Sequence, residues 1–269
     1  MNRSRFSYAK ATFAARILQT SPSGSFYEGL SVIVGYDGIR VCGGNMVYKV
    51  TLEEWQQDGA RVRKHLDPTS GDVWHMKHAI SEMKANDWPH WRQSEWPGFY
   101  FEYRESAIGN QEFQRGPRYG NVTFDLQSNL VWDLKVHVGE GGMVPLNDQE
   151  AVRDCISENG FLGWMILTGT ATYASDKDRE WHTNFKGGLS AYSISNRAAG
   201  KPSRRIKGTF TPGEIVGFGL SGLDALERAL SEGWLTGFQE GMTNSNGRPR
   251  RAKYMANLNA IPDWALLRG

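Results

Sequence analysis

The first part of the chain alternates short apolar runs with glycines and then changes to a helical pattern. Residues 31–34 and 39–42 are short apolar runs separated by a turn, which predicts two strands. Thr51 and Glu54 have the spacing of a capping box, so a helix is expected from Leu52 to about residue 64. A second helix is predicted over 71–84, where apolar side chains recur at helical intervals.

The middle of the chain shows a helix, two strands joined by a short turn, a second helix and a strongly apolar strand. The predicted ranges are 95–108, 121–126, 130–138, 147–157 and 161–172. Gly160 is placed to end the second of these helices in the left-handed conformation. Helices and strands that follow one another in this order predict the α/β class.

The last part of the chain is less regular. A hairpin is predicted from strands over 205–210 and 214–218, turned at a Thr-Pro-Gly sequence. Residues 221–232 form the strongest helical pattern of the chain, with three leucines on one face and a glycine after it. The last thirty residues have little periodicity.

Composition narrows the class of protein. The chain has 269 residues, of which 39% are hydrophobic and 22% charged, and this excludes collagen-like, disordered and coiled-coil proteins. Two cysteines in such a length exclude a small disulfide scaffold. Apolar runs stay well short of the roughly 18 residues that a membrane span needs, so a cytoplasmic location is expected. The formal net charge of +2 leaves the partners open.

Two acidic residues and a lysine on the predicted strand pair form a candidate catalytic site. Because side chains alternate along a strand, Asp133 and Lys135 lie on the same face, and the turn brings Asp125 toward them. Two carboxylates suit a hard cation such as Mg²⁺, which binds oxygen ligands and lowers the pKa of a bound water. The lysine could orient that water or stabilise charge that develops on a phosphate.

This pattern resembles the PD-(D/E)xK nuclease superfamily, whose motif is an acidic residue on one strand followed by acidic-x-Lys on the next. Asp125 and the Asp133–Lys135 triplet match it, although no proline precedes Asp125. The resemblance implies a restriction-endonuclease-like core, with a mixed central sheet flanked by helices, over residues 95–172. It also implies a metal-binding glutamate on the preceding helix, Glu102 or, one turn later, Glu105.

A structural alternative exists for the same residues. Asp125, Asp133 and Lys135 could form a solvated salt-bridge cluster. The strand that carries two of them is apolar near both ends, however, and charges on a buried strand are costly unless they are paired or bind metal. The pattern therefore favours a catalytic role.

Basic residues gather in the C-terminal third. From residue 241 onward the chain has five basic residues and one acidic residue. Such clusters neutralise phosphates, and arginines can also bind guanine edges; a solvated basic tail is the alternative. The predicted DNA-binding residues are Arg204, Arg205, Lys207, Arg248, Arg250, Arg251 and Lys253.

The resemblance and the basic clusters together predict a function. We expect a Mg²⁺-dependent endonuclease that cleaves double-stranded DNA, of the type II restriction class. Such enzymes commonly act as homodimers on palindromic sites. The expected organisation is one nuclease domain, with an N-terminal extension over 1–94 and a DNA-recognition region over 173–269. A repair or phage-processing nuclease with the same core, and a non-catalytic DNA-binding protein, are the alternatives.

Overall fold

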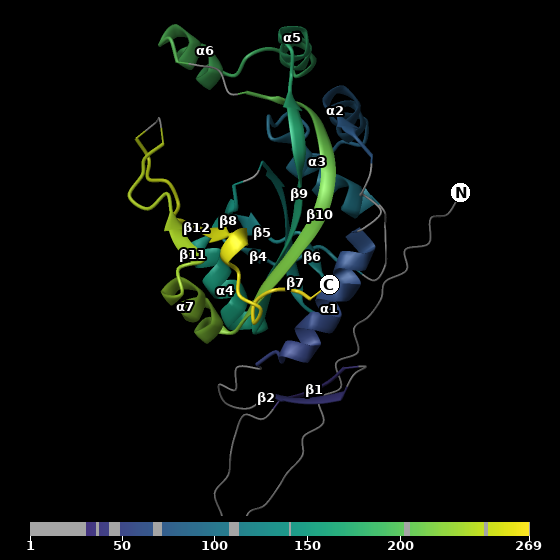
Figure 1. Ribbon diagram of the computed structural model, residues 1–269, viewed down its shortest axis with the longest axis vertical. Coiled ribbons are helices and arrows are strands. Elements are labelled where there is room, and N and C mark those ends of the chain that lie inside the picture. The colour runs from purple at the N-terminus through teal and green to yellow at the C-terminus, as the bar shows by residue number, and fades with distance from the viewer. Residues whose placement is uncertain are drawn as a thin grey trace, which may run out of the picture. The chain divides into compact units, whose positions relative to one another are not determined.

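The computed structural model describes residues 31–35, 38–42, 49–66, 72–107, 113–139, 141–201, 205–244 and 247–268 (Figure 1). Residue contacts divide the chain into two units, Met1–Tyr48 and Lys49–Gly269. In the first unit, β1 (Ser31–Gly35) and β2 (Gly38–Cys42) form an antiparallel hairpin that confirms the two predicted strands. The predicted extent of the nuclease domain stays a prediction.

A five-stranded mixed sheet organises the second unit. Its strand order is β3-β10-β9-β7-β6. The bounds are β3 Trp74–His75, β6 Leu126–Gln127, β7 Val131–Val138, β9 Phe161–Tyr173 and β10 Lys207–Ser221. β7 and β9 are parallel, whereas the β3–β10, β10–β9 and β6–β7 pairs are antiparallel. The sheet curls between helices, so the α/β class and the mixed central sheet are confirmed (Figure 1).

Helices and a smaller sheet cover the two faces of the central sheet (Figure 1). Helices α1 (Leu52–Leu66), α2 (Met76–Ala85) and α3 (Trp96–Ala107) lie on one face. Helices α4 (Gln149–Asn159) and α7 (Leu223–Ser231) lie on the other. Along β9 the side chains alternate between these two cores, as strand geometry requires: Phe161, Met165 and Leu167 face the first, and Leu162, Trp164 and Ile166 face the second.

Local signals set several helix ends as predicted. The Thr51 hydroxyl accepts from the Glu54 N–H at 3.2 Å, and the Glu54 carboxylate accepts from the Thr51 N–H at 2.8 Å, which closes the capping box of α1. Gly160 has φ +71° and ends α4. Helix α2 begins at Met76 rather than at residue 71, because Trp74 and His75 pair with β10 as β3.

The predicted hairpin over 205–218 is wrong. β10 runs through this segment as one strand, with a register irregularity between Pro212 and Ile215. Proline cannot donate to the ladder, and the irregularity accommodates Pro212 and Gly213 without a reversal of the chain. Pairing along the whole of β9 stabilises the extended form.

The helix predicted over 147–157 is α4, which begins at Gln149, two residues later than predicted, because a strand occupies the residues before it. β8 (Met143–Asp148) pairs with β12 (Lys253–Asn257), which pairs with β11 (Leu235–Phe238) in a three-stranded antiparallel sheet. A short 3₁₀ helix, Leu258–Ala260, follows β12. This small sheet brings the C-terminal segment beside the central sheet.

The remaining elements are short. The predicted strand over 121–126 is interrupted: β5 (Val122–Thr123) pairs with β4 (Arg118–Tyr119), and Asp125 lies between β5 and β6. Helices α5 (Asp176–Phe185) and α6 (Ala191–Ala198) connect the far ends of β9 and β10, each capped by a serine (Figure 1). In the part of the chain that the structure describes, no helix has the length and apolar character to span a membrane.

Candidate active site

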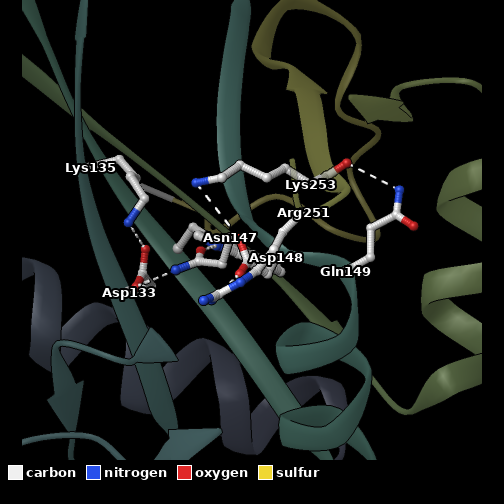
Figure 2. A network of polar contacts seen from close by, with 8 residues as sticks. Asp133, Lys135, Asn147, Asp148, Gln149, Arg251 and Lys253 are labelled. Atoms are coloured by element: carbon white, nitrogen blue, oxygen red, sulfur yellow. Dashed lines mark hydrogen bonds and ion pairs between the residues drawn. The ribbon is translucent and has the colours of Figure 1, made fainter. Parts of the chain in front are cut away.

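Strand β7 carries the acidic-x-Lys triplet into the core. Asp133 is only 1% exposed, and its carboxylate accepts a hydrogen bond from the Lys135 ammonium on the same face (Figure 2). The ammonium also donates to the Leu134 carbonyl at 3.1 Å. The Leu134 side chain packs in the core on the opposite face with the α1–α3 helices. Strand alternation thus places the two charged groups together, as the sequence predicts.

Asp125, the residue just before β6, reaches the same point. Its carboxylate accepts the backbone N–H of Leu134 at 2.8 Å. Burial, and then the charges of Asp133 and Glu102, raise the pKa of Asp125 well above its usual value, against the opposing effect of Lys135. The carboxylate therefore lies in a partly buried, negatively charged surrounding.

Asn147 is a member of this group that sequence reasoning missed. It lies near the end of β8, where its side-chain amide donates to the Asp133 carboxylate at 2.9 Å (Figure 2). Its amide oxygen accepts from the Trp164 indole at 3.1 Å, so the orientation of Asn147 is fixed from both sides. The segment was predicted as the start of a helix. An asparagine directly after a short apolar run, Met143–Leu146, was the only signal in the sequence that could have marked it.

The two candidate glutamates on α3 have different surroundings. Burial raises the pKa of Glu102 to about 7, with Lys135 lowering it and Asp133 raising it, so Glu102 is electrostatically part of the cluster. Glu105 lies 3.5 Å from the His65 imidazole, and its pKa is raised to about 7 by burial, with Arg104 lowering it. Glu102 is thus the helix carboxylate whose charge interacts with Asp133 and Lys135.

All four predicted site residues line one pocket of about 730 Å³. Burial lowers the pKa of the Lys135 ammonium, but Asp133, Asp125 and Glu102 outweigh it and raise the pKa, so Lys135 stays charged. Three carboxyl groups therefore share one ammonium. Within the described residues, no group of three or more His, Cys, Asp or Glu side chains is arranged to hold a metal ion by itself.

The predicted DNA-binding residues of the first basic cluster have different surroundings. Arg204 lies outside the described residues. The Arg205 guanidinium lies 3.7 Å from the centre of the Tyr173 ring, and the Lys207 ammonium lies 2.5 Å from the Glu95 carboxylate. Lys207 lines a second pocket, of about 470 Å³, that also contains Glu102 and Lys135.

The second basic cluster lies partly at the site. The Arg251 guanidinium contacts the Asp148 carboxylate at 2.8 Å, and the Lys253 ammonium contacts it at 3.8 Å (Figure 2). Lys253 lines the 730 Å³ pocket together with Asp133. Arg248 and Arg250 are exposed. Asp148 thus joins the C-terminal segment to the strand that carries Asn147.

Comparison of the chain with protein-family models, with curated protein sequences and with solved structures gives no match. The geometry of the pocket is therefore what supports a function.

Proposed function

We propose that this protein is a Mg²⁺-dependent endonuclease that hydrolyses phosphodiester bonds in double-stranded DNA. The observation that supports this most is the convergence of Asp125, Asp133 and Lys135 at one pocket, with Glu102 close enough to affect their titration. The residues come from β7, from the segment that precedes β6 and from α3. Asp133 is buried, and a buried carboxylate beside two further acidic groups and one ammonium costs free energy, which supports a functional role for the cluster rather than a stabilising one.

The donor chemistry of the pocket fits a hard divalent cation. Mg²⁺ typically takes one or two protein carboxylates and completes its shell with water and substrate phosphate, so a three-residue cage is not needed. Asp125 and Asp133 would hold the ion, with Glu102 at the same pocket. When bound, the ion would polarise the phosphodiester and lower the pKa of an attacking water. Burial, and then neighbouring carboxylates, raise the pKa of Asp125 and of Glu102, and a bound cation would offset both effects.

The other residues have roles that follow from their contacts. Lys135 stays protonated, and its ammonium can stabilise negative charge that develops on the phosphate. Asn147 holds the Asp133 carboxylate in one orientation. Lys253 reaches the pocket from β12, where it can contact a phosphate of the bound strand.

Within the endonucleases, we propose a type II restriction enzyme that acts as a homodimer. Two-fold symmetric proteins match palindromic sites, and the elements outside the pocket leave a large part of the chain for recognition and assembly. A repair or phage-processing nuclease would use the same pocket without sequence-specific cleavage.

The test is cleavage of a supercoiled plasmid with Mg²⁺ and with EDTA. Asp133→Asn keeps the shape of the side chain, and we expect it to lower cleavage by at least about 10²-fold while melting and DNA binding stay near wild type. The matched control is Glu150→Gln, an exposed residue on α4 that should cleave normally. Discrete metal-dependent fragments would support restriction, and smearing would support a repair-type nuclease. Equal cleavage by wild type and Asp133→Asn, or none by wild type, would overturn the proposal.

A further inference from the structure

A third pocket, which is strongly basic, is lined by residues of helices α5 and α6. Its volume is about 1170 Å³, and five cationic side chains line it against two acidic ones. The cationic residues are Arg92, Arg179, Lys186, Arg197 and Arg250; the acidic residues are Asp176 and Glu180. The cations come from four separate segments of the chain, so the fold gathers positive charge that no single stretch of sequence carries.

Little of this charge is neutralised within the pocket. Arg179 forms an ion pair with Asp176, one of the two acids. Arg197 and Arg250 are both exposed. Burial lowers the pKa of the Lys186 ammonium, and a bound anion would offset that effect. A positive pocket of this size suits a polyanion rather than a single small acid.

The N-terminus of α6 adds hydrogen-bonding capacity to the same pocket. Leu189, Ser190 and Ser193 line it, and Ser190 caps the helix by accepting from the Ser193 N–H at 3.2 Å. The positive end of the helix dipole therefore faces the basic side chains, an arrangement that favours phosphate.

The C-terminal segment connects this pocket to the candidate active site. Arg250 lines the basic pocket, and Lys253 lines the pocket of Asp133. Three residues span at most about 11 Å when fully extended, which one DNA strand covers in about three nucleotides at 3.4 Å each. In Figure 1 the loop between β11 and β12 extends toward α6, on which Arg197 lies.

We infer that this basic pocket binds the phosphate backbone of duplex DNA next to the bond that is cleaved. The inference rests on the proposed function. It assigns Arg92, Lys186 and Arg197 to DNA binding, and the sequence clusters at 201–207 and 248–253 contain none of these three. Contacts of this kind position the duplex and are independent of base sequence.

The experiment measures binding of a fluorescein-labelled duplex by anisotropy in EDTA, where no cleavage occurs. The variant is Lys186→Gln/Arg197→Gln, and the control is Lys64→Gln on α1, an exposed lysine outside the pocket. We expect Kd to rise about tenfold at moderate salt. Between about 50 and 200 mM KCl, the slope of log K against log salt should fall by about 1.8, the value for two lost phosphate contacts. The control should bind as wild type.

The outcomes separate this inference from the proposed function. If wild type binds and cleaves DNA and the double variant has the same Kd and salt slope, the pocket assignment is wrong and the nuclease stands. If wild type neither binds nor cleaves, the proposed function fails. If the variant loses affinity for an RNA competitor but not for duplex DNA, the assignment to DNA is overturned. A melting temperature equal to that of wild type shows that the variant is folded.

Discussion

Glu105 is a buried carboxyl group that should make the stability of the protein fall as pH rises from about 4.5 to about 7. It lies on α3 and is 7% exposed, and within the described residues no donor hydrogen-bonds to either carboxylate oxygen. Its carboxylate lies 3.5 Å from the His65 imidazole. A charged carboxylate without hydrogen bonds is costly in such a place, so the folded protein favours the protonated form.

The size and sign of the effect follow from the pKa. Burial raises the pKa of Glu105 from 4.5 to about 7. This difference corresponds to about 3 kcal/mol. Because the folded-state pKa lies above the unfolded one, the full stability is present below pH 4.5 and is lost as pH rises through about 7. A protonated His65 would lower the pKa of Glu105, which makes about 3 kcal/mol an upper value.

Replacing Glu105 with glutamine removes the charge at nearly constant shape. We expect Glu105→Gln to be more stable than wild type by up to about 3 kcal/mol near pH 8.5, and by much less near pH 5. Urea unfolding followed by tryptophan fluorescence at both pH values gives the two differences. Glu150→Gln, on the exposed face of α4, should change neither value. A Glu105→Gln protein that is equal to or less stable than wild type near pH 8.5 would refute the reasoning.

Three further changes test the packing around the site. Asp58→Ala should lower the free energy of unfolding by about 3–5 kcal/mol in urea titrations, because the buried carboxylate accepts from the Trp132 indole at 2.9 Å and from Ser128 at 2.5 Å. Gly163→Ala should cost at least about 1–3 kcal/mol in the same assay, because a Cβ would overlap the buried Trp132 ring; equal stability would contradict the packing. Asn147→Ala should reduce plasmid cleavage about tenfold by freeing the Asp133 carboxylate, with a stability loss of about 1–3 kcal/mol; unchanged cleavage would rule out its positioning role.

Features with a local cause could be predicted from the sequence. The helix predicted over 95–108 is α3, Trp96–Ala107, and the strand predicted over 161–172 is β9, Phe161–Tyr173. The capping box and the Gly160 cap depend on neighbours in sequence, so spacing was enough to identify them. The pairing of Asp133 with Lys135 depends only on strand alternation, which is also local.

Features that depend on residues far away in the sequence could not be predicted from it. Pro212 and Gly213 have the composition of a turn, yet β10 continues through them because β9 supplies a partner along its length. β8 is a strand because β12, more than a hundred residues later, pairs with it. For the same reason Asn147 was missed, and the five cations of the basic pocket belong to segments that only the fold brings together.

The end of a short strand explains why the candidate site lies where it does. β6 pairs with β7 only at Val131 and Trp132, and the chain before it then turns away. The next β7 N–H on that edge, that of Leu134, is bound by the Asp125 carboxylate in place of a backbone carbonyl. The Asp125 side chain therefore accepts a hydrogen bond from the exposed edge of β7 and places its carboxylate near that of Asp133. Beyond that point β7 is only partly buried, so Lys135 is reachable from the pocket. Extending β6 by two residues would replace this side-chain contact with backbone pairing, so the break in the strand is what leaves the Asp125 carboxylate at the pocket.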